Sequence, residues 1–373
     1  MTGQRGGWAL LIQFVTEGTT NFRLSLKVDK RKLVPHQTEL LPPRSFVLLL
    51  AAVVISSDSA GKRVTMMKQT IKVGFVIAVA SFLPMFVVAQ DGRPRGSAKP
   101  VTVPVTIRLR DAKPVEMRFV DYLLREDGEM QTILSARTPN DSPLTLAILM
   151  QDDLVSSVSV EGRTIANFIR NQPGGSRVMV AYIRQGTLDV RRKFTTELDK
   201  AAGSVRAPMG LPGSAPYNPY VEIIEGLKRF DSQPLGRRAM LVVSDGIDLS
   251  RGIDGSTPGQ SLDLQRAINE AQRRSVAIYS IFAPSAAQET PTLNLNGQGC
   301  LLRLSNETGG HAFFQGTAAP VSFDPFIKEL DTLLGRQIAL TYLSTHTNKG
   351  FHKLDIKPLE RDVEIRHPAG YPR

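Results

Sequence analysis

The chain has 373 residues, 42% of them apolar, enough for one large domain or two smaller ones with a substantial core. Its single cysteine, Cys300, excludes an internal disulfide framework and a metal site built from several cysteines. The net charge is +11, but residues 1–89 hold 11 basic and 4 acidic residues; the +4 left for residues 90–373 gives no electrostatic basis for a nucleic-acid partner.

Residues 67–89 have the organisation of a secretory signal peptide: a short basic region, an apolar run over 73–88, and small residues before a polar segment. The apolar run is shorter than the roughly 20 residues that a membrane span needs. We therefore expect an exported protein without an integral membrane span in its mature chain. Residues 1–66 are then expected to be an upstream extension from a start codon assigned too early. The alternative is a longer leader or a membrane anchor that uses the apolar run 46–55.

Residues 90–100 form a linker by composition, and a β-rich segment is expected over 101–140. Residues 101–109 alternate in polarity as a half-buried strand does, and Pro104 predicts an edge strand because proline cannot donate a ladder hydrogen bond. A hairpin is expected next, with strands 119–124 and 130–134 on either side of Asp127-Gly128. Asp-Gly between alternating apolar residues favours such a turn.

Strands and helices alternate over residues 141–335. Apolar runs predict buried strands at 144–150, 178–183, 238–243 and 276–282, and helices are predicted over 162–169, 262–274, 300–308 and 323–334. This order predicts an α/β fold with a doubly wound, mostly parallel sheet. A C-terminal β extension is expected over 336–373, so that β segments flank the sheet domain at both ends.

Acidic residues follow two of these strands at the point where each strand ends. Asp152 and Asp153 come after the strand 144–150, and Asp245 follows the strand 238–243. The carboxyl ends of parallel strands meet at one edge of a sheet, where ligands bind in open α/β folds. We expect the three carboxylates to lie close together, and to repel one another unless they are protonated or bind a cation.

The chain resembles the von Willebrand factor type A (VWFA) family, in its divergent secreted bacterial branch of VWFA-related proteins. The resemblance covers residues 101–373 and is carried by the strand 144–150 with its acidic end, Thr195-Thr196, the segment 241–246, and the Glu-Thr-Gly-Gly of 307–310. It implies a VWFA/Rossmann-like fold, binding of another protein, and no enzymatic activity. It also implies a metal-ion-dependent adhesion site for Mg²⁺ or Mn²⁺, hard cations that prefer oxygen ligands.

The sequence departs from the Asp-x-Ser-x-Ser motif of that site. Gln151 stands where the first Asp should be, and a motif that starts instead at Asp153 has Val155 in its middle. The resemblance therefore implies a degenerate adhesion site, whose candidate metal ligands are Asp152, Asp153, Ser157, Thr196 and Asp245. A solvated acidic rim that binds no metal is the alternative.

Two further classes of function stay open. A hydrolase on a flavodoxin-like sheet would use Ser244, but no Gly-x-Ser-x-Gly or phosphate-loop motif occurs, and nothing orients a histidine toward this serine. An envelope scaffold without a specific ligand is the other class. The segment Gly297-Gln298-Gly299 is expected to form a helix-entry loop rather than a dinucleotide fingerprint. The five histidines do not approach His-x-x-x-His spacing. His346 and His352 lie in a polar loop and a β segment and are expected at the surface.

Overall fold

The computed structural model describes residues 11–16, 22–27, 98–109, 121–209, 216–286, 290–359 and 363–373. The chain divides into two compact units, Met1–Val88 and Ala89–Arg373. In the first unit β1 (Leu11–Thr16) pairs antiparallel with β2 (Phe22–Lys27). The expected signal peptide over 67–89 lies outside the described residues. Within the described ranges, none of the helices has the length and apolar character needed to cross a membrane.

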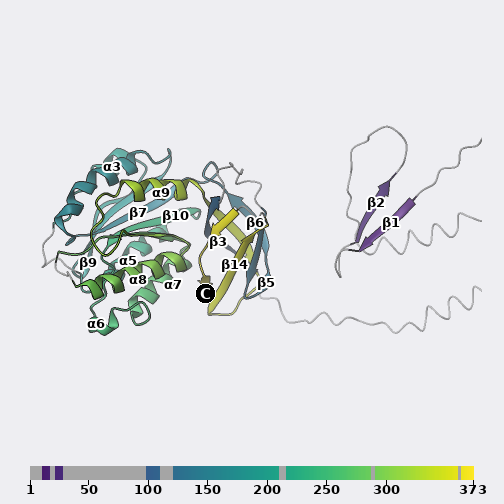
Figure 1. Ribbon diagram of the computed structural model, residues 1–373. Helices are drawn as coiled ribbons and strands as arrows, with labels where there is room; N and C mark the ends of the chain where they lie inside the picture. Colours follow the sequence, from purple (N-terminus) through teal and green to yellow (C-terminus); the bar gives the residue numbers. More distant parts are fainter. Residues whose placement is uncertain are drawn as a thin grey trace, which may run out of the picture. The chain divides into compact units, whose positions relative to one another are not determined.

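The second unit has a central sheet with helices on both sides (Figure 1). Six strands form this sheet, and their order defines its fold. They are β7 (Leu144–Gln151), β8 (Arg177–Arg184), β9 (Thr187–Thr195), β10 (Arg237–Ser244), β11 (Ala277–Phe282) and β12 (Ala312–Phe313). The order across the sheet is β12-β11-β10-β7-β8-β9, and only the edge strand β9 is antiparallel to its neighbour. This is the doubly wound order of Rossmann-like sheets. The predicted α/β fold with a mostly parallel sheet is confirmed.

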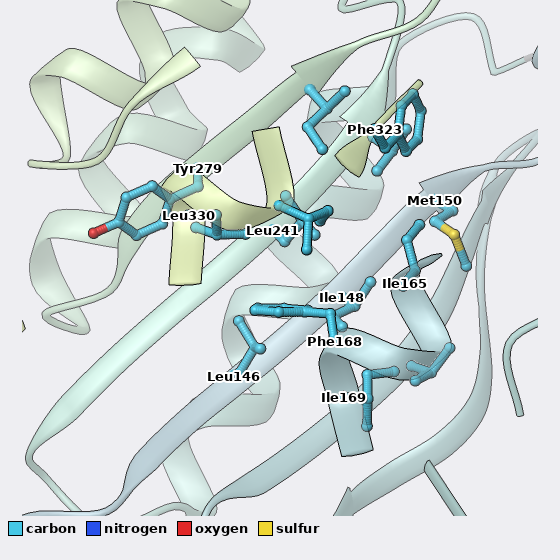
Figure 2. Packing of buried hydrophobic residues seen from close by; sticks show 14 of the residues in the cluster. Leu146, Ile148, Met150, Ile165, Phe168, Ile169, Leu241, Tyr279, Phe323 and Leu330 are labelled. Atoms are coloured by element: carbon cyan, nitrogen blue, oxygen red, sulfur yellow. The ribbon is translucent and has the colours of Figure 1, made fainter. Parts of the chain in front are cut away.

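Helices cover both faces of this sheet. One face carries α3 (Gly162–Arg170), α4 (Leu198–Ala202) and α9 (Asp324–Gly335), and the other carries α5 (Pro219–Lys228), α7 (Leu262–Arg273) and α8 (Pro291–Glu307). Shorter turns of helix are η2 (Ser156–Glu161), η4 (Arg229–Ser232) and α6 (Gly252–Gly255). Figure 2 shows the first face, where Ile165 and Phe168 of α3 pack beside Leu146 and Ile148 of β7. Each such buried side chain contributes roughly 1.5–3 kcal/mol.

The helix α8 starts at Pro291, well before the predicted start at residue 300. Gly297-Gln298-Gly299 therefore lies inside a helix, and the expected helix-entry loop was wrong. The reason is a close crossing of two backbones: a Cβ on Gly297 would lie 2.0 Å from the carbonyl oxygen of Asp245. On the other side of the crossing Gly246 has φ +68°, and its Cβ would lie 2.6 Å from the carbonyl oxygen of Gly297. Only glycine at both positions allows this approach.

The two predicted β segments together form a single β sandwich. Its sheets are ordered β15-β3-β13-β6 and β16-β14-β4-β5. The strands are β3 (Lys99–Leu109), β4 (Tyr122–Glu126), β5 (Glu129–Met130), β6 (Thr132–Arg137), β13 (Gln337–Ser344), β14 (Phe351–Pro358), β15 (Val363–Arg366) and β16 (Gly370–Pro372). Val101, Val103 and Val105 of β3 belong to the core of the sandwich.

Two details of the β sandwich differ from the sequence-based predictions. β3 pairs with β13 on one side and with β15 on the other, so the prediction that it is an edge strand was wrong. β15 pairs only with residues 106–109 of β3, however, so Pro104 has a neighbouring strand on one side alone, β13. The predicted turn at Asp127-Gly128 is present, with φ values of 51° and 87°. Its second strand, β5, is only two residues long, and the chain then enters the other sheet as β6.

The sandwich packs against the amino ends of the parallel strands. Arg237, the first residue of β10, is 3% exposed, and its guanidinium donates to the carbonyl oxygens of Ser142 (3.2 Å), Leu334 and Gln337 (2.7 Å). Burial lowers the pKa of Arg237 to about 10. Since the sandwich occupies this end of the strands, their carboxyl ends lie at the opposite end of the sheet.

Candidate functional site

The carboxyl ends of β7 and β10 are neighbours at the point where the strand order reverses. Met150 pairs with Val243, so the residues that follow each of them lie side by side. Ligands of open α/β folds bind at this position. The polar side chains here are almost fully buried: the exposed fraction is 1% for Gln151, 0% for Asp153 and 4% for Asp245.

The side-chain amide of Gln151 joins these groups. Its Nε2 donates to Asp153 Oδ1 at 2.8 Å and to Asp245 Oδ2 at 2.9 Å. Its Oε1 accepts from Ser244 Oγ at 2.6 Å and from the main-chain nitrogen of Asp245 at 3.2 Å. Two donors and two acceptors are the full capacity of a side-chain amide. The hydrogen-bonding capacity of the Gln151 side chain is therefore fully used within the protein.

The remaining carboxylate oxygens of the site also have hydrogen-bond partners. Asp153 Oδ2 accepts from the hydroxyl of Ser285, and Asp245 Oδ1 accepts from the main-chain nitrogen of Ile247 at 3.0 Å. Desolvation by burial raises the pKa of Asp245 to about 7, and the nearby charge of Asp153 acts in the same direction. Both carboxylate oxygens of Asp245 thus accept hydrogen bonds from donors within the protein, and the carboxyl group is partly protonated near neutral pH.

Asp152 belongs to a different set of contacts. Arg206 donates to it through Nη1 at 2.6 Å and Nη2 at 3.0 Å, and Arg184 Nε lies 3.2 Å from its Oδ2. The hydrogen bonds that Arg206 donates to Asp152 raise the pKa of Arg206, whose guanidinium lies 3.9 Å from the ring centre of Tyr182. The charge of Asp152 is therefore neutralised by two arginines. The sequence analysis missed both arginines, because no spacing motif links a carboxylate to such distant partners; Arg206 lies 54 positions further along the chain.

Thr196 does not lie at this edge of the sheet. It follows β9, which runs antiparallel, so that Thr195 pairs with Val178 near the start of β8. The carboxyl edge is marked by the pairing of Gln151 with Ile183. At about 3.3 Å per residue, these two positions on β8 are roughly 16 Å apart. The predicted convergence of Thr196 with the aspartates was wrong.

The described residues do not fit the implied Mg²⁺ or Mn²⁺ site. Ser157 is exposed in the 3₁₀ helix η2, and Thr196 lies at the other end of the sheet. Asp153 and Asp245 do converge, but their oxygens accept internal hydrogen bonds. A cation there would have to displace the amide of Gln151.

Ser244 lies in the same buried centre. Its hydroxyl donates to Gln151 Oε1 at 2.6 Å and accepts from the main-chain nitrogen of Gly246 at 3.0 Å, and the residue is 0% exposed. Neither of these two partners is a general base. The arrangement fixes the turn after β10 and leaves the hydroxyl inaccessible to a substrate.

The loop before α5, the short helix α6 and the first turns of α8 expose large apolar side chains near this buried centre. Tyr217 is 67% exposed, Ile253 60% and Leu295 58%; we call these three residues the apolar rim. The segments that carry them are linked by hydrogen bonds. The main-chain nitrogen of Leu249 donates to the carbonyl of Tyr217 at 2.8 Å, and Asn296 Nδ2 of α8 donates to Ser256 Oγ at 2.8 Å. The carboxyl edge thus combines a closed polar centre with an exposed apolar border.

Comparison with known proteins addresses the fold. No family model and no curated protein matches the sequence. Similar solved structures include an aerotolerance-related membrane protein from Bacteroides fragilis, BatB from Bacteroides thetaiotaomicron, and the SpRpn10 VWA domain, each 12% identical to this chain. The matches cover 52%, 52% and 50% of this chain and 98%, 98% and 95% of the others, with TM-scores of 0.36, 0.37 and 0.34. The VWA-like fold is assigned from the order and direction of the strands in the central sheet.

Proposed function

We propose that this chain is an exported, VWA-like module that binds another protein at the carboxyl edge of its sheet without a resident cation. The observation that carries the proposal is the apolar rim around a buried polar centre whose hydrogen bonds are internally satisfied. Exposed aromatic and aliphatic side chains grouped on neighbouring loops are typical of protein-binding surfaces. A saturated centre does not offer the open coordination position of a metal-dependent adhesion site.

The test is a comparison of variants in a capture experiment. The tagged full chain, isolated from its native source in buffer with EDTA, is expected to retain a specific partner. A double variant, Tyr217→Asp with Leu295→Asp, should lose that partner, because two carboxylates would be brought into the interface. Leu359→Asp is the matched control, since Leu359 is 65% exposed in the β sandwich rather than on the rim.

Cation-assisted adhesion is the second candidate, favoured by the convergence of Asp153 and Asp245 on one amide group. Partner capture that requires Mg²⁺ or Mn²⁺ and is abolished by EDTA would support it against the first. Capture that is insensitive to both the rim substitutions and EDTA would contradict both candidates.

Export is tested separately by the amino terminus of the isolated chain. The segment 67–89 predicts a mature protein that begins at or close to Gln90 in an extracytoplasmic fraction. Recovery of the chain only from the cytoplasm, with residues 1–66 still attached, would contradict export.

A further inference from the structure

A second cluster of ionisable side chains lies in the β sandwich, outside the candidate site. It brings together Glu126, the last residue of β4, His346 in the loop after β13, and His352 near the start of β14. Each of these residues offers one ligand atom, and the three atoms lie within 4.8 Å of one another. The expected surface position of His352 was wrong: this residue is 6% exposed.

Glu126 is the unusual member of the cluster. It is 0% exposed, and among the described residues neither of its carboxylate oxygens has a hydrogen-bond partner. Burying a carboxylate without hydrogen bonds is costly, so such a group normally faces a cation. The positively chargeable atom beside it is His346 Nδ1, 3.6 Å from Oε2, which is also buried without a hydrogen bond to a described residue.

Asp127 orients the ring of His352. Its Nδ1 lies 2.7 Å from Asp127 Oδ2, and the other oxygen of Asp127 accepts from the main-chain nitrogen of Lys353 at 2.8 Å. A carboxylate that accepts from one ring nitrogen fixes the tautomer and leaves the lone pair on the other nitrogen, the usual outer-shell arrangement of metal-binding histidines. The other nitrogen, Nε2, lies 2.9 Å from the carbonyl oxygen of Asn348 and donates to it, so a metal would have to displace both this contact and the Nε2 proton.

His346 lies between two carboxylates, at distances longer than a hydrogen bond. Its Nε2 lies 3.6 Å from Glu129 Oε2, while Nδ1 faces Glu126. The loop that carries it is held in place, because Gln131 Oε1 accepts from the main-chain nitrogen of Thr345 at 3.1 Å and Arg373 donates to the carbonyl oxygen of His346.

We propose that Glu126, His346 and His352 form a binding site for a divalent transition metal, with Zn²⁺ as the best match. Two imidazoles and a carboxylate suit zinc rather than Mg²⁺ or Ca²⁺, and they leave a fourth position for water. Zinc–ligand bonds of about 2.0–2.1 Å place the ligand atoms of a tetrahedron roughly 3.4 Å apart. The 3.6 Å between His346 Nδ1 and Glu126 Oε2 is close to this value, and small side-chain movements bring His352 into range. The metal would tie the β4–β5 hairpin to the β13–β14 loop.

The site is tested on the untagged full chain by calorimetric titration with ZnCl₂ and by the visible absorption of Co²⁺. We expect one tight Zn²⁺ per chain and an intense tetrahedral Co²⁺ spectrum. Glu126→Gln and His346→Gln should each weaken binding by at least about 100-fold, and Asp127→Asn by about 10- to 100-fold, as for outer-shell partners. The control is His311→Gln: this histidine lies 3.9 Å from Glu329, outside the cluster, and its loss should change nothing.

Thermal unfolding in EDTA shows whether each variant is folded. Glu126→Gln removes a buried charge and is expected to be at least as stable as the wild type in EDTA. His346→Gln changes a partly exposed position, so it is a second variant that is expected to fold and in which the loss of metal binding can be measured. Absence of binding by the wild-type chain would overturn the proposal. Binding that survives both ligand substitutions, or that is lost in His311→Gln, would overturn it equally, because the metal would then lie elsewhere.

Discussion

Gln151 and Asp245 are joined by two hydrogen bonds that run in opposite directions. Gln151 Nε2 donates to Asp245 Oδ2 at 2.9 Å, and Gln151 Oε1 accepts from the main-chain nitrogen of Asp245 at 3.2 Å. The pair ties the end of β7 to the end of β10, where the strand order of the sheet reverses. The crevice that binds ligands in many doubly wound folds is here bridged by the protein itself.

The substitution Gln151→Asp tests this bridge directly. It removes the amide donors and adds a third carboxylate beside Asp153 and Asp245. In EDTA the free energy of unfolding should fall by about 3–5 kcal/mol, as for other uncompensated buried charges. Added Mg²⁺ should restore about 2.7 kcal/mol at a concentration 100 times its Kd, because only the folded chain presents the converging carboxylates. Urea unfolding with and without Mg²⁺ measures both effects.

Gln185→Asp is the control for that experiment. Gln185 is exposed in the turn between β8 and β9, so the same change in charge should alter stability little and should not make it depend on Mg²⁺. A wild-type chain whose unfolding free energy rises with Mg²⁺ as much as that of Gln151→Asp would contradict the internal bridge.

The sequence predicted the repeating pattern of this fold better than its long-range pairings. Buried strands and amphipathic helices have local periodicity, and the strand predicted over 144–150 is β7 almost residue for residue. The convergence of Asp153 and Asp245 followed from the rule that parallel strands end together. The prediction that Thr196 joins them was wrong because β9 runs antiparallel, so that β9 ends at the opposite edge of the sheet. Glu126 and His346 meet only through the folding of the sandwich, which local spacing does not encode.

Asp245 should make the stability of the protein depend on pH. Its carboxyl ionises near pH 3.8 when unfolded and near pH 7 when folded, because burial disfavours the charged form. Between these values the folded chain binds more protons, so the unfolding free energy should fall as pH rises from about 4 to about 7. The fall is at most about 4 kcal/mol for a shift of this size. Asp245→Asn should remove this component, as measured by urea unfolding across that range.

The matched variant is Asp254→Asn, which changes an exposed carboxylate in the same loop and should leave the pH profile of the wild type intact. Titrating groups distant from the buried centre contribute equally to all three proteins, so the difference between profiles reports on Asp245 and on its coupling to Asp153. Parallel profiles for Asp245→Asn and the wild type would show that this carboxyl ionises normally in the folded state.

The crossing of α8 over the loop after β10 predicts opposite effects for two glycine substitutions. Gly297→Ala places a Cβ 2.0 Å from the carbonyl oxygen of Asp245, so helix or loop must move, at a cost of about 1–3 kcal/mol or more. Gly335→Ala, in the last turn of α9, meets no atom within 4 Å and should stabilise the protein by about 0.4–1 kcal/mol, because alanine restricts the unfolded chain. Thermal unfolding of both variants measures the contrast. Equal melting temperatures would show that α8 does not contact the loop that positions Asp245 as closely as the Gly297 geometry indicates.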